Sequence, residues 1–317
     1  MASPLIIFRA LADPTRLRII ALLRQMELSV GELAQVLGQS QPRVSRHVKI
    51  LADADLCERR REGSWVFLGL GPAARGGALL AAIDGWPDVA AERWAVADAA
   101  RLAAVRAERM AAAEAFFNAR APEWDAIRSL HVAEAEVEAA IRTLLEEAPI
   151  GRLVDIGTGT GRMIELLGPT AETMVGIDRS PEMLRVARAK VAGAGLDRAE
   201  LRQGDMYALP LADGAADTVV LHQVLHYAQA PAAAIGEAAR LLGPGGRLLV
   251  VDFAAHEREE LRLTDAHVRL GFDDRQIDGW LTAAGLEPTA TRELGGGELT
   301  VKLWLGRREP RQLKAVA

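Results

Sequence analysis

The sequence predicts an α/β protein made of three consecutive parts and a short tail. Residues 1–72 contain short amphipathic helical patterns that end in a β-like pair. Residues 73–148 are rich in alanine, and residues 149–306 alternate short apolar runs with helical patterns. The last pattern is typical of parallel strands joined by crossover helices. Residues 307–317 form the tail.

Length and composition limit the class of protein. The 317 residues are enough for about two domains, and half of them are hydrophobic, as in globular proteins. Cys57 is the only cysteine, which excludes an intrachain disulfide and a cysteine metal cage. The first apolar run is too short for a signal peptide, and the uncharged stretch 218–236 contains two histidines. We therefore expect a cytoplasmic protein without a membrane span.

The charge is distributed unevenly along the chain. The formal net charge is −5, which taken alone argues against nucleic-acid binding. Residues 1–70 nevertheless carry a net charge of +3, and residues 71–317 carry −8. Opposite signs in two parts of one chain indicate separate partners for them.

The N-terminal part predicts a helix-turn-helix. Asp13 is followed by proline and opens one helix. Ser29 and Glu32 form a capping-box pattern at the start of a short helix that ends at Gly38. Ser40 begins the next helix. A short helix, a glycine turn and a second helix with a polar, basic face are typical of DNA-reading modules.

The second of these helices, from about Gln41 to Ala54, is the expected reading helix, and a wing follows it. Arginine and glutamine side chains on its outer face can form bidentate contacts with guanine or adenine. Arginines 59–61 precede the expected hairpin tip, Glu62–Gly63, where they can bind phosphates. Solvated arginines of a small helical domain are the alternative interpretation. The candidate DNA contacts are Ser40, Gln41, Arg43, Ser45, Arg46, His47, Arg60 and Arg61.

About 65 N-terminal residues resemble the ArsR-type winged helix-turn-helix regulators. The resemblance lies in the segments 8–19, 41–51 and 63–66. It implies a homodimer that binds an inverted-repeat operator in double-stranded DNA, with the second helix in the major groove. Many members sense metals through cysteines in the preceding helix, but the corresponding stretch 27–33 has none. We therefore expect no metal site.

The alanine-rich part predicts two long helices separated by Pro122. Neither Gly nor Pro occurs from Asp88 to Ala121 or from Glu123 to Ala148. The first helix is a candidate for dimerisation. The aromatic-rich stretch 115–125 is either a lid over a ligand site or plain packing, and the sequence does not decide between them.

A glycine-rich turn marks the expected ligand site of the C-terminal part. An apolar strand with Asp155 runs into Gly157, Gly159 and Gly161, and Asp178 follows 23 residues after Asp155. An acidic residue at that place can hold both hydroxyls of a ribose. A nicotinamide or flavin site needs glycines spaced Gly-x-Gly-x-x-Gly, whereas here the glycines are two apart. An adenosine with an amino-acid tail, such as S-adenosylmethionine, fits better.

Four motifs in order across about 150 residues resemble the class I S-adenosylmethionine-dependent methyltransferases, of the ubiquinone and menaquinone biosynthesis type. The resemblance implies a doubly wound, Rossmann-like sheet of seven mostly parallel strands. It places Asp155, Gly157 and Gly159 at the methionine end, Asp178 at the ribose and Asp205 with Met206 at the adenine. The loop that begins at His222 and Gln223 would face the sulfonium and acceptor. The candidate cofactor contacts are Asp155, Gly157, Gly159, Asp178, Arg179, Met183, Asp205, Met206, His222 and Gln223.

Two functions remain open at this point. In the first, the protein is a transcriptional regulator, a repressor, that senses S-adenosylmethionine or S-adenosylhomocysteine. In the second, it is an active methyltransferase of a small molecule with an appended autoregulatory DNA-binding domain. Methyl transfer from a sulfonium depends mostly on positioning, so no catalytic residue is assigned. His222 and His226 could share a helix face, but they lack a third metal ligand nearby. Arsenic methylation needs several cysteines and is not expected.

Overall fold

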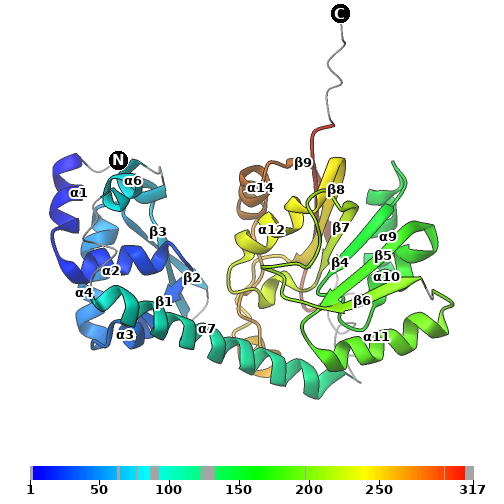
Figure 1. Cartoon of the computed structure of the whole chain (residues 1–317), viewed down its shortest axis with the longest axis horizontal. Coiled ribbons are helices and arrows are strands. Elements are labelled where there is room, and N and C mark those ends of the chain that lie inside the picture. The colour runs from blue at the N-terminus through cyan, green and yellow to red at the C-terminus, as the bar shows by residue number, and fades with distance from the viewer. Residues whose placement is uncertain are drawn as a thin grey trace, which may run out of the picture. The chain divides into compact units, whose positions relative to one another are not determined.

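The computed structural model divides into two compact units, residues 1–112 and 113–317. It describes residues 3–62, 65–75, 78–85, 93–121, 124, 133–196, 198–295 and 297–310. Figure 1 shows helices around a small sheet in unit 1 and a large sheet between helices in unit 2. Both units therefore have the fold classes that the sequence predicts.

Unit 1 is a helical module with a three-stranded antiparallel sheet in the order β1-β3-β2. Asp13 caps α2 by accepting the Arg16 N–H at 3.1 Å. Ser29 and Glu32 form the predicted capping box at α3. The elements are α1 (Pro4–Leu11), α2 (Pro14–Leu23), β1 (Leu28–Ser29), α3 (Val30–Leu37), α4 (Gln41–Asp53), β2 (Cys57–Glu62), β3 (Trp65–Leu70), α5 (Pro72–Arg75), α6 (Ala78–Asp84) and α7 (Arg93–Arg120), which ends in unit 2.

The helix-turn-helix and the wing have the predicted local geometry. Gly38 ends α3 with φ +64°, a left-handed conformation that glycine adopts without strain. In the hairpin, Glu62 pairs with Trp65, so Glu62 ends strand β2 instead of forming the tip. Residues 63 and 64, where the rest of the predicted tip falls, lie outside the described part of the chain.

Of the two helices predicted between the sheets, the second is interrupted within its predicted range. The first is α7, and within its expected range residues 88–92 lie outside the description. The second is α9 (Glu134–Leu145). Ala133, the residue before α9, has a non-helical ψ of 117°, so that this helix begins after it. A lack of glycine and proline permits a helix but does not prescribe its start.

Unit 2 is built on a seven-stranded sheet in the order β6-β5-β4-β7-β8-β10-β9. Strand β10 is antiparallel to both neighbours, and the other pairs are parallel. The strands are β4 (Gly151–Ile156), β5 (Ala171–Asp178), β6 (Ala199–Gln203), β7 (Ala216–His222), β8 (Leu242–Phe253), β9 (Glu287–Leu294) and β10 (Val301–Arg307). The further helices are α10 (Arg162–Leu167), α11 (Pro181–Gly193), α12 (Pro231–Arg240), α13 (Glu260–Thr264), α14 (Asp274–Ala283) and the 3₁₀ turns η2 (Gly168–Thr170) and η3 (Leu225–Tyr227).

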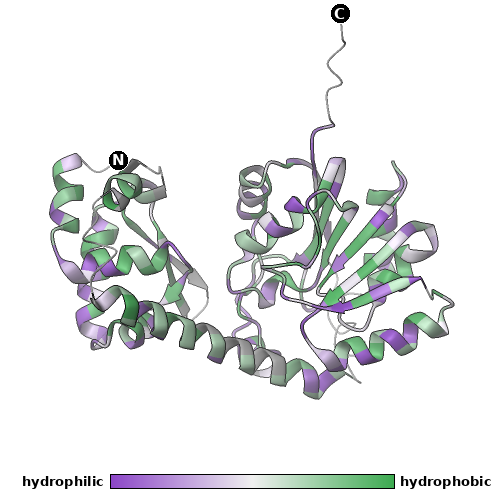
Figure 2. Ribbon diagram, in the orientation of Figure 1, coloured by the Kyte–Doolittle hydropathy of each residue, from purple (hydrophilic) through white to green (hydrophobic). Residues whose placement is uncertain are grey.

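Apolar side chains pack on both faces of this sheet. Leu153 of β4 belongs to one buried cluster, together with α9, α10 and α11. Its neighbour Val154 belongs to the other cluster, together with α12 and α14. This alternation is the period of two that a strand covered on both faces shows. Figure 2 shows apolar residues along the central strands. Among the described residues, no helix has the length and apolarity needed to cross a bilayer.

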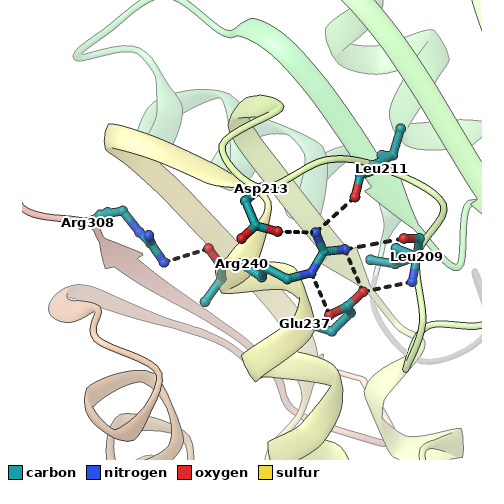
Figure 3. A network of polar contacts seen from close by, with 7 residues as sticks. Leu209, Leu211, Asp213, Glu237, Arg240 and Arg308 are labelled. Carbon is teal, nitrogen blue, oxygen red and sulfur yellow. Dashed lines mark hydrogen bonds and ion pairs between the residues drawn. The ribbon is translucent and has the colours of Figure 1, made fainter.

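A network of polar contacts fixes the loop before β7 (Figure 3). Arg240, at the end of α12, donates to the carbonyl oxygens of Leu209 and Leu211 at 3.2 and 2.9 Å. It also pairs with Glu237 and Asp213 at 2.7 and 2.6 Å. Bonding to Arg240 lowers the pKa of Glu237, with a smaller contribution from the Leu209 N–H. The loop that follows the predicted adenine residues is thereby tied to α12.

Candidate functional site

The candidate ligand site lies where the strand order reverses. Strand β4 comes first in the chain of this sheet, and its two neighbours are β5 and β7. In doubly wound sheets, ligands bind beyond the carboxyl ends of the strands at such a point. The glycine turn follows the carboxyl end of β4, and Asp178 and His222 are the last residues of β5 and β7. The fold therefore gathers these predicted cofactor residues at one edge of the sheet.

The glycine turn after β4 is held against strand β5. The N–H groups of Gly157 and Thr158 both donate to the carbonyl oxygen of Ile177, at 2.7 and 3.0 Å. Gly157 has φ +71°, and a Cβ there would lie 2.3 Å from a Val224 methyl. Only glycine fits both the conformation and the space. At Gly159, with φ +53°, a Cβ would lie 3.7 Å from the indole nitrogen of Trp124.

Asp178 is bonded to the glycine turn by its carboxylate. One oxygen accepts the Gly159 N–H and the other accepts the Ser180 N–H, both at 2.8 Å. Burial raises the pKa of Asp178, and these backbone bonds oppose the shift. A carboxylate has about four acceptor positions, so Asp178 keeps acceptor capacity for a ribose hydroxyl. Its neighbour Arg179 is half-buried.

The other predicted cofactor residues have mixed environments. Asp155 is 1% exposed and accepts the Thr158 hydroxyl at 2.6 Å, so its buried carboxylate stabilises the conformation of the glycine turn. Asp205 and Met206 are half-buried, and Asp205 accepts the Tyr207 N–H at 3.1 Å. Met183 is 2% exposed in the first turn of α11. Positive-φ glycines beside an acidic residue that follows a strand fit a nucleoside with an amino-acid tail.

Strand β7 ends in an unusual backbone conformation. His222 is its last residue, and Gln223 has φ +49°, which is uncommon for a residue other than glycine. The Gln223 N–H donates to the Val251 carbonyl oxygen at 2.7 Å, which holds this conformation. Such strained positions occur preferentially in functional sites.

Sequence reasoning did not find two contacts near this edge. The hydroxyl of Ser180 donates to the side-chain oxygen of Asn118 in α7 at 2.5 Å. His226 Nδ1 lies 2.8 Å from Asp252 Oδ1, and both side chains are buried. Asp252 interrupts the apolar run of its strand, which was the one local signal in the sequence.

The aromatic stretch before the sheet contacts this same edge. The ring of Phe117 packs edge-on against those of Tyr227 and Trp124, with centroids 4.7 and 5.4 Å apart. Because Trp124 lies beside Gly159, these rings border the glycine turn. Residues 125–132 lie outside the described chain.

The predicted DNA-reading residues lie on α4 and β2. Ser40, Gln41, Arg43, Ser45 and Arg46 are exposed, while Val44, Val48 and Leu51 are fully buried. His47 differs from its neighbours, because its side chain is 14% exposed and its Nδ1 lies 3.6 Å from Asp13 Oδ1. Arg60 and Arg61 belong to β2, but their side chains lie outside the description.

Cys57 is buried, and burial raises the pKa of its thiol to about 11. Thiols are nucleophiles and metal ligands as thiolates, so this one is unreactive at neutral pH. Across the described ranges, no group of three His, Cys, Asp or Glu side chains could hold a metal ion.

Two family models match the chain, one in each unit. Residues 13–59 match the model of the bacterial regulatory proteins of the ArsR family. Residues 154–250 match a methyltransferase domain. The chain joins an ArsR-family helix-turn-helix to a methyltransferase domain. The ArsR match spans the helices α2, α3 and α4, and the methyltransferase match spans the glycine turn, Asp178 and Asp205.

Known proteins resemble each domain separately. Over 70 residues, 22% of this chain and 60% of the relative, the ArsR-type domain is 44% identical to the arsenical resistance operon repressor of Escherichia coli. Over 143 residues, 43% of this chain and 64% of the relative, the chain is 37% identical to the demethylmenaquinone methyltransferase of Thermus thermophilus. The chain thus spans less than two thirds of the length of either relative.

A solved structure supports the fold of the methyltransferase domain. A SAM-dependent methyltransferase from Thermotoga maritima superimposes with a TM-score of 0.51 at 22% identity. The match covers 62% of this chain and 99% of that protein. At this identity the similarity concerns the fold alone.

Proposed function

We propose that this protein is a homodimeric, cytoplasmic repressor that binds an inverted-repeat operator and senses S-adenosylmethionine or S-adenosylhomocysteine. Occupancy of the methyltransferase domain changes the affinity of the ArsR-type domain for DNA. One observation carries the coupling: helix α7 begins in unit 1 and ends in unit 2. A single continuous helix therefore runs from the unit that contains the helix-turn-helix into the unit that contains the candidate cofactor site.

The first part of α7 is bonded to the helix-turn-helix. Asp98, which is 3% exposed, accepts two hydrogen bonds from the guanidinium of Arg18, at 2.6 and 2.7 Å. Arg18 also donates to the carbonyl oxygen of Leu37 at 3.2 Å. Leu37 is the last residue of α3, three positions before the cap of α4. A shift of α7 would therefore move Arg18 and, through it, the end of α3 that precedes the reading helix.

The last part of α7 contacts the candidate cofactor site. Asn118 accepts the hydroxyl of Ser180, and the Ser180 N–H donates to Asp178. Phe117 packs on Tyr227 and Trp124. A nucleoside bound to Asp178 would therefore alter the position of Ser180, which holds the last turns of α7 through Asn118. Ligand binding shifts a conformational equilibrium when it favours one arrangement of such contacts.

Helix α1 supports the homodimer. Its side chains Leu5, Ile6 and Phe8 are 61, 48 and 61% exposed. Large apolar side chains grouped on one short helix are typical of a contact surface. Two copies of this basic domain would supply the two reading helices that an inverted repeat requires.

Operator binding measured by fluorescence anisotropy, with and without each nucleoside, tests the proposal. Saturating S-adenosylmethionine or S-adenosylhomocysteine should change the operator Kd at least 5-fold, which corresponds to about 1 kcal/mol. Asn118→Ala should bind the nucleoside but show a smaller change, whereas Arg275→Ala, at an exposed position of α14, should behave as wild type. An operator Kd unaffected by both nucleosides would exclude sensing.

A further inference from the structure

His226 and Asp252 form a buried pair at the carboxyl edge of the sheet. Their side chains are 2% and 0% exposed, and His226 Nδ1 lies 2.8 Å from Asp252 Oδ1. His226 lies in η3, four residues after the end of β7, and Asp252 lies in the last two residues of the neighbouring strand β8. The pair therefore lies on the side of the switch point away from Asp178 and β5.

The bonds around Asp252 determine which imidazole nitrogen carries hydrogen. Oδ2 accepts the N–H groups of Leu225 and His226 at 2.9 and 3.2 Å, and Oδ1 accepts the Phe253 N–H at 2.8 Å. A carboxylate that accepts from both oxygens requires His226 Nδ1 to donate. In the neutral imidazole, Nε2 then carries the lone pair that a base needs.

No described residue donates a hydrogen bond to Nε2 of His226. His226 Nε2 is buried and has no hydrogen-bond partner among the described residues. A buried acceptor without a partner costs free energy, so such an atom needs an explanation, and a catalytic role is one that fits its place beside the candidate site. A role limited to holding η3 would need Nδ1 and not Nε2.

Aromatic rings connect this imidazole to the glycine turn. The rings of Tyr227, His267 and Phe253 have centroids 3.9, 4.3 and 5.0 Å from that of His226. Tyr227 also contacts Trp124, with centroids 6.2 Å apart, and Trp124 borders Gly159. An aromatic acceptor could replace part of this cluster while Nε2 stays shielded from water.

We propose that His226 is the general base of a methyl transfer to a phenolic hydroxyl, and that Asp252 is its positioning residue. The inference rests on the proposed binding of S-adenosylmethionine and adds an activity to it. Nε2 takes the hydroxyl proton while the phenolic oxygen forms a bond to the methyl carbon. The bond from that carbon to sulfur breaks, its electron pair stays on sulfur, and S-adenosylhomocysteine leaves. The imidazolium then releases the proton to water.

The base strength of an imidazole favours a phenolic hydroxyl as the methyl acceptor. An imidazole base is effective for hydroxyls whose pKa is not far above its own, as in phenols at about 10. Carboxylates and free amines need no base, and aliphatic alcohols are far less acidic. The aromatic lining fits a flat ring as well.

The test uses the full-length protein, labelled S-adenosylmethionine, and catechol and 1-naphthol as probes. His226→Asn can keep the bond to Asp252, since its side-chain nitrogen takes the place of Nδ1, but it lacks Nε2. We expect kcat to fall at least 100-fold, the contribution of a general base, with unchanged affinity for S-adenosylmethionine. His256→Asn, a half-buried histidine outside the pair, should keep wild-type kcat.

The pH profile separates a base from a structural role. In the wild type, kcat/KM should rise with pH as the base loses its proton, and His226→Asn should lose this rise. Asp252, Tyr227 and His267 also face the imidazole. His267 is the second imidazole there, so His267→Asn is the control, and it should retain the rise if His226 is the base.

Two outcomes would overturn the inference. One is the absence of any methylated phenol although calorimetry shows that S-adenosylmethionine binds. The other is an unchanged rate and pH profile in His226→Asn. Failure of the nucleoside itself to bind would instead refute the proposed function.

Discussion

The reading helix α4 and the glycine turn of the methyltransferase domain are prepared for their ligands in opposite ways. Gln41, Arg43 and Arg46 of α4 are exposed, and the helix is held by other, apolar positions. The glycine turn is itself bonded to β5 and to Asp178. Changes on α4 should therefore affect affinity alone, whereas changes in the glycine turn should affect affinity and folding together.

The largest effect is expected on the DNA side. Arg43→Ala combined with Arg46→Ala should weaken operator binding by about 2–6 kcal/mol, since each base contact contributes about 1–3 kcal/mol. Stability and S-adenosylmethionine affinity should not change, because both side chains are exposed. Gel shifts measure operator binding, urea unfolding measures stability, and calorimetry measures S-adenosylmethionine affinity. Arg185→Ala, an exposed arginine on α11, is the matched control, and equal operator affinity in both variants would refute the assignment of α4.

The next effect tests the glycine turn. Gly157→Ala adds a Cβ 2.3 Å from Val224 at a residue with φ +71°, so it should destabilise unit 2 by about 2–4 kcal/mol. It should also abolish binding of S-adenosylmethionine. Urea unfolding followed by tryptophan fluorescence measures the stability.

Gly193→Ala is the control for that variant, because no atom lies within 4 Å of a Cβ built there. It should be neutral or slightly stabilising, since it replaces glycine in a helix. If both alanine variants bind S-adenosylmethionine equally, the turn is not part of the cofactor site.

Asp178 should affect affinity through hydrogen bonds to the ribose. Asp178→Ala should lower S-adenosylmethionine affinity by about 1–3 kcal/mol, the value of charge-assisted hydrogen bonds. Burial raises the pKa of Asp178, so wild-type affinity should begin to fall at a higher pH than for an ordinary aspartate as the pH is lowered. The variant should lack this dependence. Calorimetry across the acid range would contradict the assignment if the two proteins gave the same curve.

The smallest effect concerns the loop before β7. Arg240→Met leaves the carbonyl groups of Leu209 and Leu211 without this donor and should cost about 1–2 kcal/mol of stability. Because bonding to Arg240 lowers the pKa of Glu237, the stabilisation from the Arg240–Glu237 pair is complete above the ordinary Glu pKa of about 4.3 and is lost as pH falls through the lowered value, whereas the bonds to the carbonyl groups do not depend on pH in this range. Arg202→Met, which breaks an exposed pair with Glu200, should cost under about 0.5 kcal/mol. Equal losses in thermal unfolding would argue against a special role for this network.

The sequence predicts local features well and distant ones poorly. The caps at Asp13 and Ser29 were predictable because they depend on residues three apart. Asp178 was predictable because its place after a second strand is part of a motif. The contacts of Asn118 with Ser180 and of His226 with Asp252 join residues 62 and 26 positions apart. Such contacts depend on strand register and helix packing, which a single sequence does not specify.

The central claim is that cofactor occupancy and operator binding are coupled through one chain. Coupling between two sites is reciprocal, so the operator must change S-adenosylmethionine affinity by the same factor as the nucleoside changes operator affinity. Calorimetric titration of S-adenosylmethionine into the full-length protein, with and without saturating operator duplex, measures this directly. We predict two Kd values that differ at least 5-fold, by the same factor that anisotropy should give for operator binding. Identical Kd values would contradict it.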